Sequence, residues 1–288
     1  MEKQELTVLK IEDLRPFPGN PFHLVEDEQL MELSESIKEF GMAAPILTRP
    51  AEDGNGYEVI AGQRRVRASE LAGIENVPAF VLPIDRDRAI ITLVDSNIQR
   101  ESILPSERAF AYKMKLDAMK RQGKRTDLTS VPLAQKSQGK TSRQLLGEQV
   151  GESQDQIRRY IRLTELITPI LDMVDSGKIA IRPAVELSYL PKEQQTILLD
   201  TMQLEDCTPS HAQAIKMRKF ADEGRLNEDV ILSILSEEKG NQKEQFRMPK
   251  ERISKYFSPG TPAKQMEDTI VKALELYRKR ERSKDRER

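Results

Sequence analysis

The chain has 288 residues, more than one hydrophobic core usually organises, so two or three small domains are expected. Charged residues make up 32% and the net charge is -1, so any nucleic-acid surface must be a local one. One cysteine and two separated histidines exclude an internal disulfide and argue against structural zinc, and no apolar run is long enough for a membrane span or a signal peptide.

The first hundred residues predict a small α+β domain. Short apolar runs predict four strands, at Thr7–Ile11, Ile46–Thr48, Tyr57–Ala61 and Val77–Leu82, with the middle two joined as a hairpin. Helical spacing of apolar residues predicts three helices, from Asp27 to Gly41, from near Arg64 to Gly73, and from about Asp87 to Asn97.

The pattern after Pro105 is helical. We expect a helix over Ala109–Met119, a loop over Arg121–Thr141 and several short helices from Ser142 to Leu235. A polar break precedes a C-terminal module, whose helix carries an apolar face that either dimerises or packs back on its own domain. The face consists of Met266, Ile270, Ala273, Leu274 and Tyr277. The expected domains are therefore 1–104, 105–235 and 246–288.

An arginine motif follows the third predicted strand, where residues 57–67 read YEVIAGQRRVR. Gly62 lets the backbone approach an anion, the first N–H groups of a helix point toward it, and Arg64, Arg65 and Arg67 supply charge-assisted hydrogen bonds. The pattern therefore indicates a phosphate site, although a solvated basic helix face would have the same sequence. A second cluster, SNIQRE at 96–101, offers amide and guanidinium donors to a phosphate or a water, or simply forms a capped helix junction.

Residues 142–163, SRQLLGEQVGESQDQIRRYIRL, predict a helix-turn-helix. Gly147 is small where the second helix crosses the first, Gly151 suits the turn, and Ser153 can cap the second helix. Ile157 and Ile161 would pack that helix inward. A plain helical hairpin with a salt-bridged surface is the alternative.

The outward face of the second helix is rich in Gln and Arg, which suit adenine and guanine edges and phosphates. Residues 100–165 contain 14 Lys and Arg against 8 Asp and Glu, a local basic excess. Since one short helix covers few base pairs, we expect a homodimer on a palindromic or pseudo-palindromic double-stranded site. The predicted DNA-binding residues are Ser153, Gln154, Gln156, Arg158, Arg159 and Arg162.

Residues 7–110 resemble the N-terminal domain of the ParB/Noc partition-protein family. Its G-E-R-R-x-R box is similar to residues 62–67, its E-N-x-Q-R box to residues 96–100, and two further stretches to 20–22 and 36–46. The resemblance implies a ParB/sulfiredoxin-like α+β fold that binds and slowly hydrolyses CTP with Mg2+, followed by an all-α DNA-binding domain. It also implies nucleotide-binding residues Gly62, Gln63, Arg64, Arg65, Arg67, Asn97, Gln99 and Arg100, with Asn97 as the catalytic candidate.

The sequence departs from the family pattern at three positions. Gln63 and Ser96 replace glutamates, and Ala44 replaces a glutamine. A divalent cation prefers carboxylate oxygen, and Asp95 would project from a different side of its helix. The metal ligands are therefore unknown, and nucleotide binding is expected rather than efficient hydrolysis.

These features predict a centromere-type DNA-binding protein that partitions a plasmid, chromosome or mobile element, with CTP as a switch and a ParA-like ATPase as partner. It would be cytoplasmic and associated with a nucleoid or plasmid, without a membrane partner. One alternative is a KorB-like transcriptional regulator with the same DNA reader. A second is a protein that is first of all an enzyme, because sulfiredoxin-like and nuclease relatives share the fold; no cysteine lies near Gly62 to support it.

Overall fold

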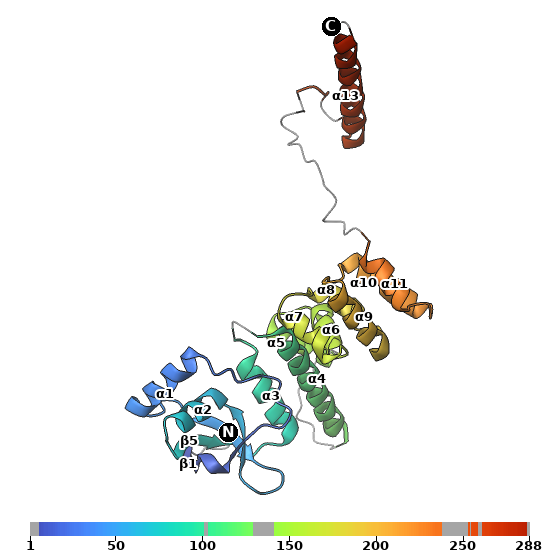
Figure 1. The fold of residues 1–288 in the computed structure, drawn as a ribbon. Helices are drawn as coiled ribbons and strands as arrows, with labels where there is room; N and C mark the ends of the chain where they lie inside the picture. The colour runs from blue at the N-terminus through green and yellow to red at the C-terminus, as the bar shows by residue number, and fades with distance from the viewer. Residues whose placement is uncertain are drawn as a thin grey trace. The chain divides into compact units, whose positions relative to one another are not determined.

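The computed structural model describes residues 6–100, 103–128, 141–237, 253, 255–258 and 261–286 (Figure 1). The described residues up to Glu237 form one compact unit, and those after it form a second. The predicted order of an α+β part followed by an all-α part is confirmed. None of the helices in the described ranges combines the length and the apolar character that crossing a bilayer requires.

The described strands form a mixed sheet in the order β1-β5-β3-β4-β2. The predicted hairpin is present, since β3 and β4 pair antiparallel; β1 and β5 also pair antiparallel, whereas β2–β4 and β3–β5 are parallel. Strand β2 was not predicted, because three residues are too few to show an alternating pattern. The strands are β1 (Leu6–Lys10), β2 (Leu14–Pro16), β3 (Ile46–Pro50), β4 (Tyr57–Ala61) and β5 (Asn76–Val81).

The predicted helices of the N-terminal part are present with their caps. Asp27 accepts a hydrogen bond from Leu30 N at 2.9 Å at the start of the first helix, and Gly41 follows its end with φ of 76°. The described elements are the short helix η1 (Ile11–Asp13), α1 (Glu28–Phe40), α2 (Gln63–Leu71) and α3 (Arg86–Asn97). Helices α1 and α2 pack together around a small core of buried apolar side chains.

Helix α4 (Pro105–Leu128) is longer than predicted, and the expectation of a loop from Arg121 is wrong as far as Leu128. Arg121 pairs with Asp87 of α3 at 2.8 Å, and the fully buried Lys115 pairs with Asp95. These ion pairs to α3 stabilise α4 where its own sequence is polar. Sequence periodicity cannot reveal such contacts between distant residues. The remainder of the predicted loop, 129–140, lies outside the described residues.

Helix α4 contributes to two cores, which explains why the α+β and helical parts form one unit. Its Ala111 and Ala118 pack with α3, and its Tyr112 and Leu116 pack with the following helices. Figure 1 shows α4 between α3 and those helices. They are α5 (Ser142–Val150), α6 (Gln154–Leu163), α7 (Thr168–Asp175), α8 (Ile181–Leu187), α9 (Lys192–Leu204), α10 (His211–Asp222) and α11 (Glu228–Leu235).

The second unit contains α13 (Ala263–Arg286), which confirms the helix predicted there. Met266 is buried, whereas Leu274 is 62% exposed, so part of the predicted apolar face is open among the residues that the structure describes. Residues 246–252 of the predicted C-terminal module lie outside the described residues.

Candidate functional site

The start of α2 has the geometry of an anion site. Gly62 has φ of 101°, and a Cβ at this position would lie 2.7 Å from Cγ2 of Ile46, so only glycine fits. Gly62 is also the N-cap residue, no side chain caps the helix, and no acidic residue occupies the first turn. The first N–H groups of α2 are therefore available to a negatively charged ligand.

Two of the predicted arginines are paired with carboxylates. Arg64 Nη2 lies 2.7 Å from Asp27 Oδ1, and this hydrogen bond holds the pKa of Asp27 below its usual value. Arg67 lies 2.8 Å from Glu26 and 2.9 Å from Glu70. Glu26 and Asp27, which precede α1, thus occupy guanidinium groups that could otherwise bind a phosphate.

Arg65 and Arg100 differ from that pair, because neither makes an ion pair within the described ranges. Arg65 donates to the carbonyls of Ala44 and Pro45, the second at 2.7 Å, and burial lowers its pKa. Arg100 is exposed and lies 5.9 Å from the centre of the Phe22 ring. Partial desolvation lowers its pKa, the charge of Glu107 opposes this shift, and the charge of Arg64 adds to it less strongly. An anion beside these cations would replace the hydration that they have lost.

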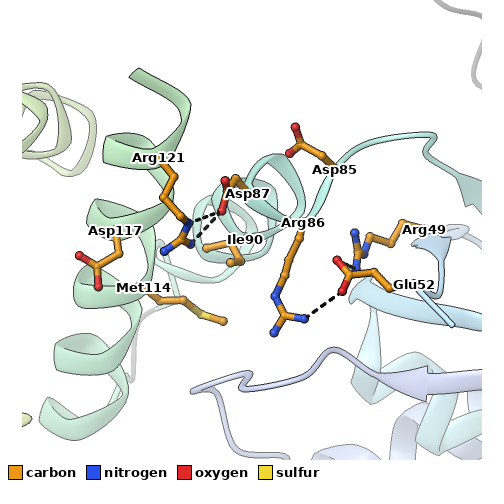
Figure 2. A pocket seen from close by; sticks show the side chains of 9 residues that line it. All are labelled: Arg49, Glu52, Asp85, Arg86, Asp87, Ile90, Met114, Asp117 and Arg121. Carbon is orange, nitrogen blue, oxygen red and sulfur yellow. Dashed lines mark hydrogen bonds and ion pairs between the residues drawn. The ribbon is translucent and has the colours of Figure 1, made fainter. Parts of the chain in front are cut away.

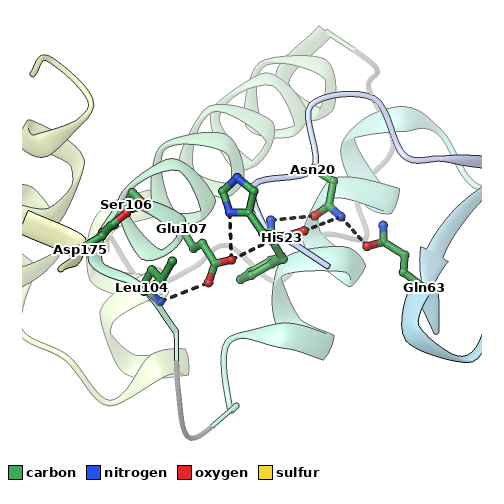
Figure 3. A network of polar contacts seen from close by, with 8 residues as sticks. Asn20, His23, Gln63, Leu104, Ser106, Glu107 and Asp175 are labelled. Carbon is green, nitrogen blue, oxygen red and sulfur yellow. Dashed lines mark hydrogen bonds and ion pairs between the residues drawn. The ribbon is translucent and has the colours of Figure 1, made fainter. Parts of the chain in front are cut away.

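A polar network connects the start of α2 with the start of α4 (Figure 3). Asn20 Nδ2 donates to Gln63 Oε1 at 2.8 Å. In the same segment as Asn20, the backbone N–H of His23 donates to Glu107 Oε1 at 2.7 Å. The backbone N–H of Leu104 donates to the other carboxylate oxygen, Glu107 Oε2, at 3.1 Å. Gln63, predicted as a nucleotide contact, therefore also anchors the segment around Asn20 by a hydrogen bond.

A hollow of about 480 Å³ lies beside the network, between the segment from Leu14 to Leu24, β4 and α2. Phe17, Leu24 and Val66 contribute apolar walls, while Asn20 and Gln63 contribute polar groups. Aromatic and aliphatic walls with a few polar groups suit a flat, polar-edged ligand portion. The arginines that line this hollow are Arg15 and Arg67.

The second predicted cluster, at residues 96–101, contains a buried asparagine. Asn97 is buried, and its amide donates to Leu93 O at 2.7 Å and lies 3.2 Å from Ser96 Oγ, so both contacts stay within α3. Gln99 is exposed. The Nδ2 group of Asn97 is therefore engaged within its own helix, and the catalytic role of this residue stays a prediction.

Carboxylates that could hold a divalent cation are not gathered here. Asp95, the neighbour of Ser96, is paired with Lys115 of α4. Among the described residues, no three His, Cys, Asp or Glu side chains come together as a metal site.

A larger hollow of about 740 Å³ lies between β3, α3 and α4 (Figure 2). Its arginines are engaged with acids: Arg121 pairs with Asp87, and Arg86 lies 3.7 Å from Glu52. Acidic residues outnumber arginines in its lining, so it does not suit a phosphate. Sequence reasoning did not identify this hollow, which depends on helices distant in sequence.

The predicted helix-turn-helix is confirmed in α5 and α6. A Cβ on Gly147 would lie 2.7 Å from the carbonyl oxygen of Glu152, so the crossing requires glycine. Gly151 has φ of 71° in the turn. Ser153 Oγ accepts a hydrogen bond from Gln156 N at 3.2 Å, so this predicted DNA-binding residue also caps α6.

Helix α6 has one buried and one open face. Ile157, Tyr160 and Leu163 are buried, and within the described chain no ion pair engages the exposed arginines on the other face. That face carries Gln154, Gln156, Arg158 and Arg159. Arg162 is different, because its guanidinium donates to the carbonyl oxygen of Ser188 at 2.6 Å.

The comparisons agree with this arrangement. The ParB N-terminal domain model matches residues 1–98, and the ParB HTH domain model matches residues 133–218. The chromosome-partitioning protein Spo0J of Thermus thermophilus is 30% identical over 227 residues, covering 78% of this chain and 76% of that protein. Stage 0 sporulation protein J of Bacillus subtilis is 32% identical over 180 residues, covering 62% of this chain and 56% of that protein.

A solved structure is also similar, that of the C-terminally truncated chromosome-partitioning protein ParB from Caulobacter crescentus complexed to the centromeric parS site. Its identity is 21% and its TM-score 0.43, over 80% of this chain and 98% of that chain. An α+β domain joined through a shared helix to a helix-turn-helix domain defines the present chain as a two-part helix-turn-helix protein. The chain belongs to the ParB family.

Proposed function

We propose that this protein binds a specific DNA site and acts in partitioning a chromosome, plasmid or mobile element. The observation that carries the proposal is the open face of α6, where two glutamines and two arginines extend from a helix whose other face is buried. Glutamine and arginine recognise adenine and guanine through paired hydrogen bonds. The name of the Thermus relative, a chromosome-partitioning protein, supplies the partition role.

Binding as a homodimer follows from the small footprint of α6. A helix of this length reads only a few base pairs, so a two-fold site bound by two copies is needed for specificity. We assign α13 as the dimerisation element, because its exposed Leu274 lies on an apolar stripe of a helix in a separate unit. A ParA-like ATPase would be the partner that moves the DNA complex.

A nucleoside triphosphate is the ligand that we propose for the start of α2. Arg65 and Arg100 make no ion pair within the described ranges, although the charge of Glu107 acts on Arg100, and Gly62 leaves the helix N–H groups open. The hollow of about 480 Å³ would hold the base and ribose, and CTP is the nucleotide implied by the family. Arg64 would join the phosphates after leaving Asp27.

We expect binding rather than rapid turnover. Ser96 supplies no carboxylate for Mg2+, Asp95 is held by Lys115, and the Asn97 amide is engaged inside its own helix. The bound Mg2+ would therefore depend largely on the phosphates themselves. Steady CTP hydrolysis in the absence of DNA would instead favour a primarily enzymatic role.

Genome-wide mapping of bound sites, with and without CTP, tests the function. A partition protein should occupy a few clustered sites, with occupancy that spreads into flanking DNA only when CTP is present. Occupancy confined to promoters would favour the transcriptional regulator. Absence of any enriched sequence would contradict specific DNA binding.

A further inference from the structure

The last turn of α6 is tied to the helices behind it by stacked side chains. The Arg162 guanidinium lies 4.1 Å from the centre of the Tyr189 ring, and the Arg218 guanidinium of α10 lies 3.6 Å from the same ring. We call Arg162, Tyr189 and Arg218 the Tyr189 stack. Arg162 also donates to Ser188 twice, from Nη2 to the carbonyl at 2.6 Å and from Nε to Oγ at 3.1 Å.

Each guanidinium of the stack has its own acceptor, which offsets their mutual repulsion. Ser188 is the C-cap residue of α8, so Arg162 binds at the negative end of that helix. Arg218 pairs with Glu186 of α8 at 2.9 Å and lies 3.9 Å from Asp222. The stack therefore joins α6, α8 and α10 through directional contacts.

These contacts can fix the direction of α6 in a way that its apolar face cannot. Burial of Ile157 and Leu163 is non-directional and tolerates small rotations of the helix. A planar guanidinium held by two hydrogen bonds and a ring has one geometry, which a lysine cannot reproduce. Because each residue adds about 1.5 Å along a helix, Arg162 lies roughly 12 Å along α6 from Gln154. A small tilt of the helix at Arg162 therefore displaces the residues proposed to contact the bases.

We propose that Arg162 is a positioning residue for DNA recognition and does not contact DNA itself. Through the Tyr189 stack it sets the angle at which α6 presents Gln154, Gln156 and Arg158 to the groove. This inference rests on the proposed DNA binding. It assigns a different role to one of the six residues that the sequence pattern places on the DNA face.

The test uses the full chain and a duplex that the wild-type protein selects from a randomised library, with a scrambled duplex of equal length for comparison. Arg162→Lys should weaken binding to the selected duplex about tenfold, the scale of one lost base contact. It should leave the salt dependence and the scrambled-duplex affinity unchanged, because no phosphate contact is lost. Tyr189→Leu should have the same effect, Tyr189→Phe should not, and the Arg162→Lys/Tyr189→Leu double variant should be no worse than either single variant.

Arg159→Gln is the matched control from the exposed face. If Arg159 contacts a phosphate, its loss should lower the slope of log affinity against log salt by about 1 and weaken both duplexes. The proposal is overturned if Arg162→Lys binds like wild type while Arg162→Gln lowers the slope as Arg159→Gln does. Arg162 would then be a phosphate contact.

A measurement without DNA separates this proposal from the proposed function. If the wild-type protein selects no sequence, specific DNA binding fails as a function, but hydrogen exchange of the α6 amides in the free protein still tests the stack. Faster exchange in both Arg162→Lys and Tyr189→Leu, at unchanged overall helicity, supports the positioning role. Unchanged exchange in both variants refutes it.

Discussion

Neighbouring arginines of this protein serve different purposes, which their partners decide. Arg64 is held by a carboxylate and Arg65 by backbone carbonyls, although the two are adjacent in sequence. In α6, Arg159 is open whereas Arg162 is enclosed by Ser188 and Tyr189. A guanidinium keeps its charge in all these settings, so its availability, and not its ionisation, determines what it can bind.

Asp27→Asn tests whether the carboxylate competes with a ligand for Arg64. Asparagine can still accept the Leu30 hydrogen bond that caps α1, so the helix start is preserved while the negative charge is removed. CTP should bind about threefold more tightly, the scale expected for releasing a partly exposed ion pair. Isothermal titration measures this effect.

Glu12→Gln provides the comparison, because it removes a carboxylate from the more exposed pair that Glu12 forms with Lys10, away from Arg64. Its CTP affinity should equal that of the wild type. Weaker binding by Asp27→Asn would mean that Asp27 orients Arg64 for the ligand and does not compete with it.

At the scale of elements, the crossing of α5 and α6 depends on a single glycine. Gly147→Ala would bring a Cβ to 2.7 Å from a backbone oxygen, which cannot move without shifting α6. Such overpacking should destabilise the protein by about 1–3 kcal/mol and lower the midpoint of thermal unfolding. Gln149→Ala, at an exposed position of the same helix, should leave the midpoint nearly unchanged.

Local signals explain which elements were predictable. Asp27, Gly41, Gly151 and Ser153 act within a few residues of their own position, so the caps and the turn could be predicted from the sequence. The extension of α4 could not, since it depends on Asp87, which is distant in sequence. The contacts of Arg162 could not be predicted for the same reason, because nothing near it in sequence indicates Ser188 or Tyr189.

At the scale of the first compact unit, α4 packs against both the α+β part and the helical part. Lys115 on α4 is completely enclosed, and its ammonium is paired with Asp95 of α3. Asp95→Asn would leave that buried charge without a counter-ion, at a cost of about 1–3 kcal/mol in the free energy of unfolding. Lys115→Met removes the buried ammonium and with it the need for a counter-ion. Chemical denaturation should therefore show a smaller decrease in the free energy of unfolding than for Asp95→Asn.

Asp117→Asn is the matched control on α4, because its partner Lys120 is exposed and lies 3.6 Å away. Its free energy of unfolding should change little. Equal losses in Asp95→Asn and Lys115→Met would show that the ion pair itself, and not the uncompensated ammonium, sets the cost.

At the scale of the assembled protein, the proposed dimer depends on α13. Met266, Ile270, Leu274 and Tyr277 recur every three or four residues, the spacing with which helices pair. Leu274→Glu places a charge on that stripe and should convert a dimer into a monomer by light scattering. It should also weaken binding to a two-fold DNA site far more than binding to a half-site, because the second half-site is no longer engaged at high effective concentration. Lys272→Glu places the same glutamate off the stripe, with a larger change in charge, and should remain dimeric. A dimeric Leu274→Glu protein would place self-association elsewhere.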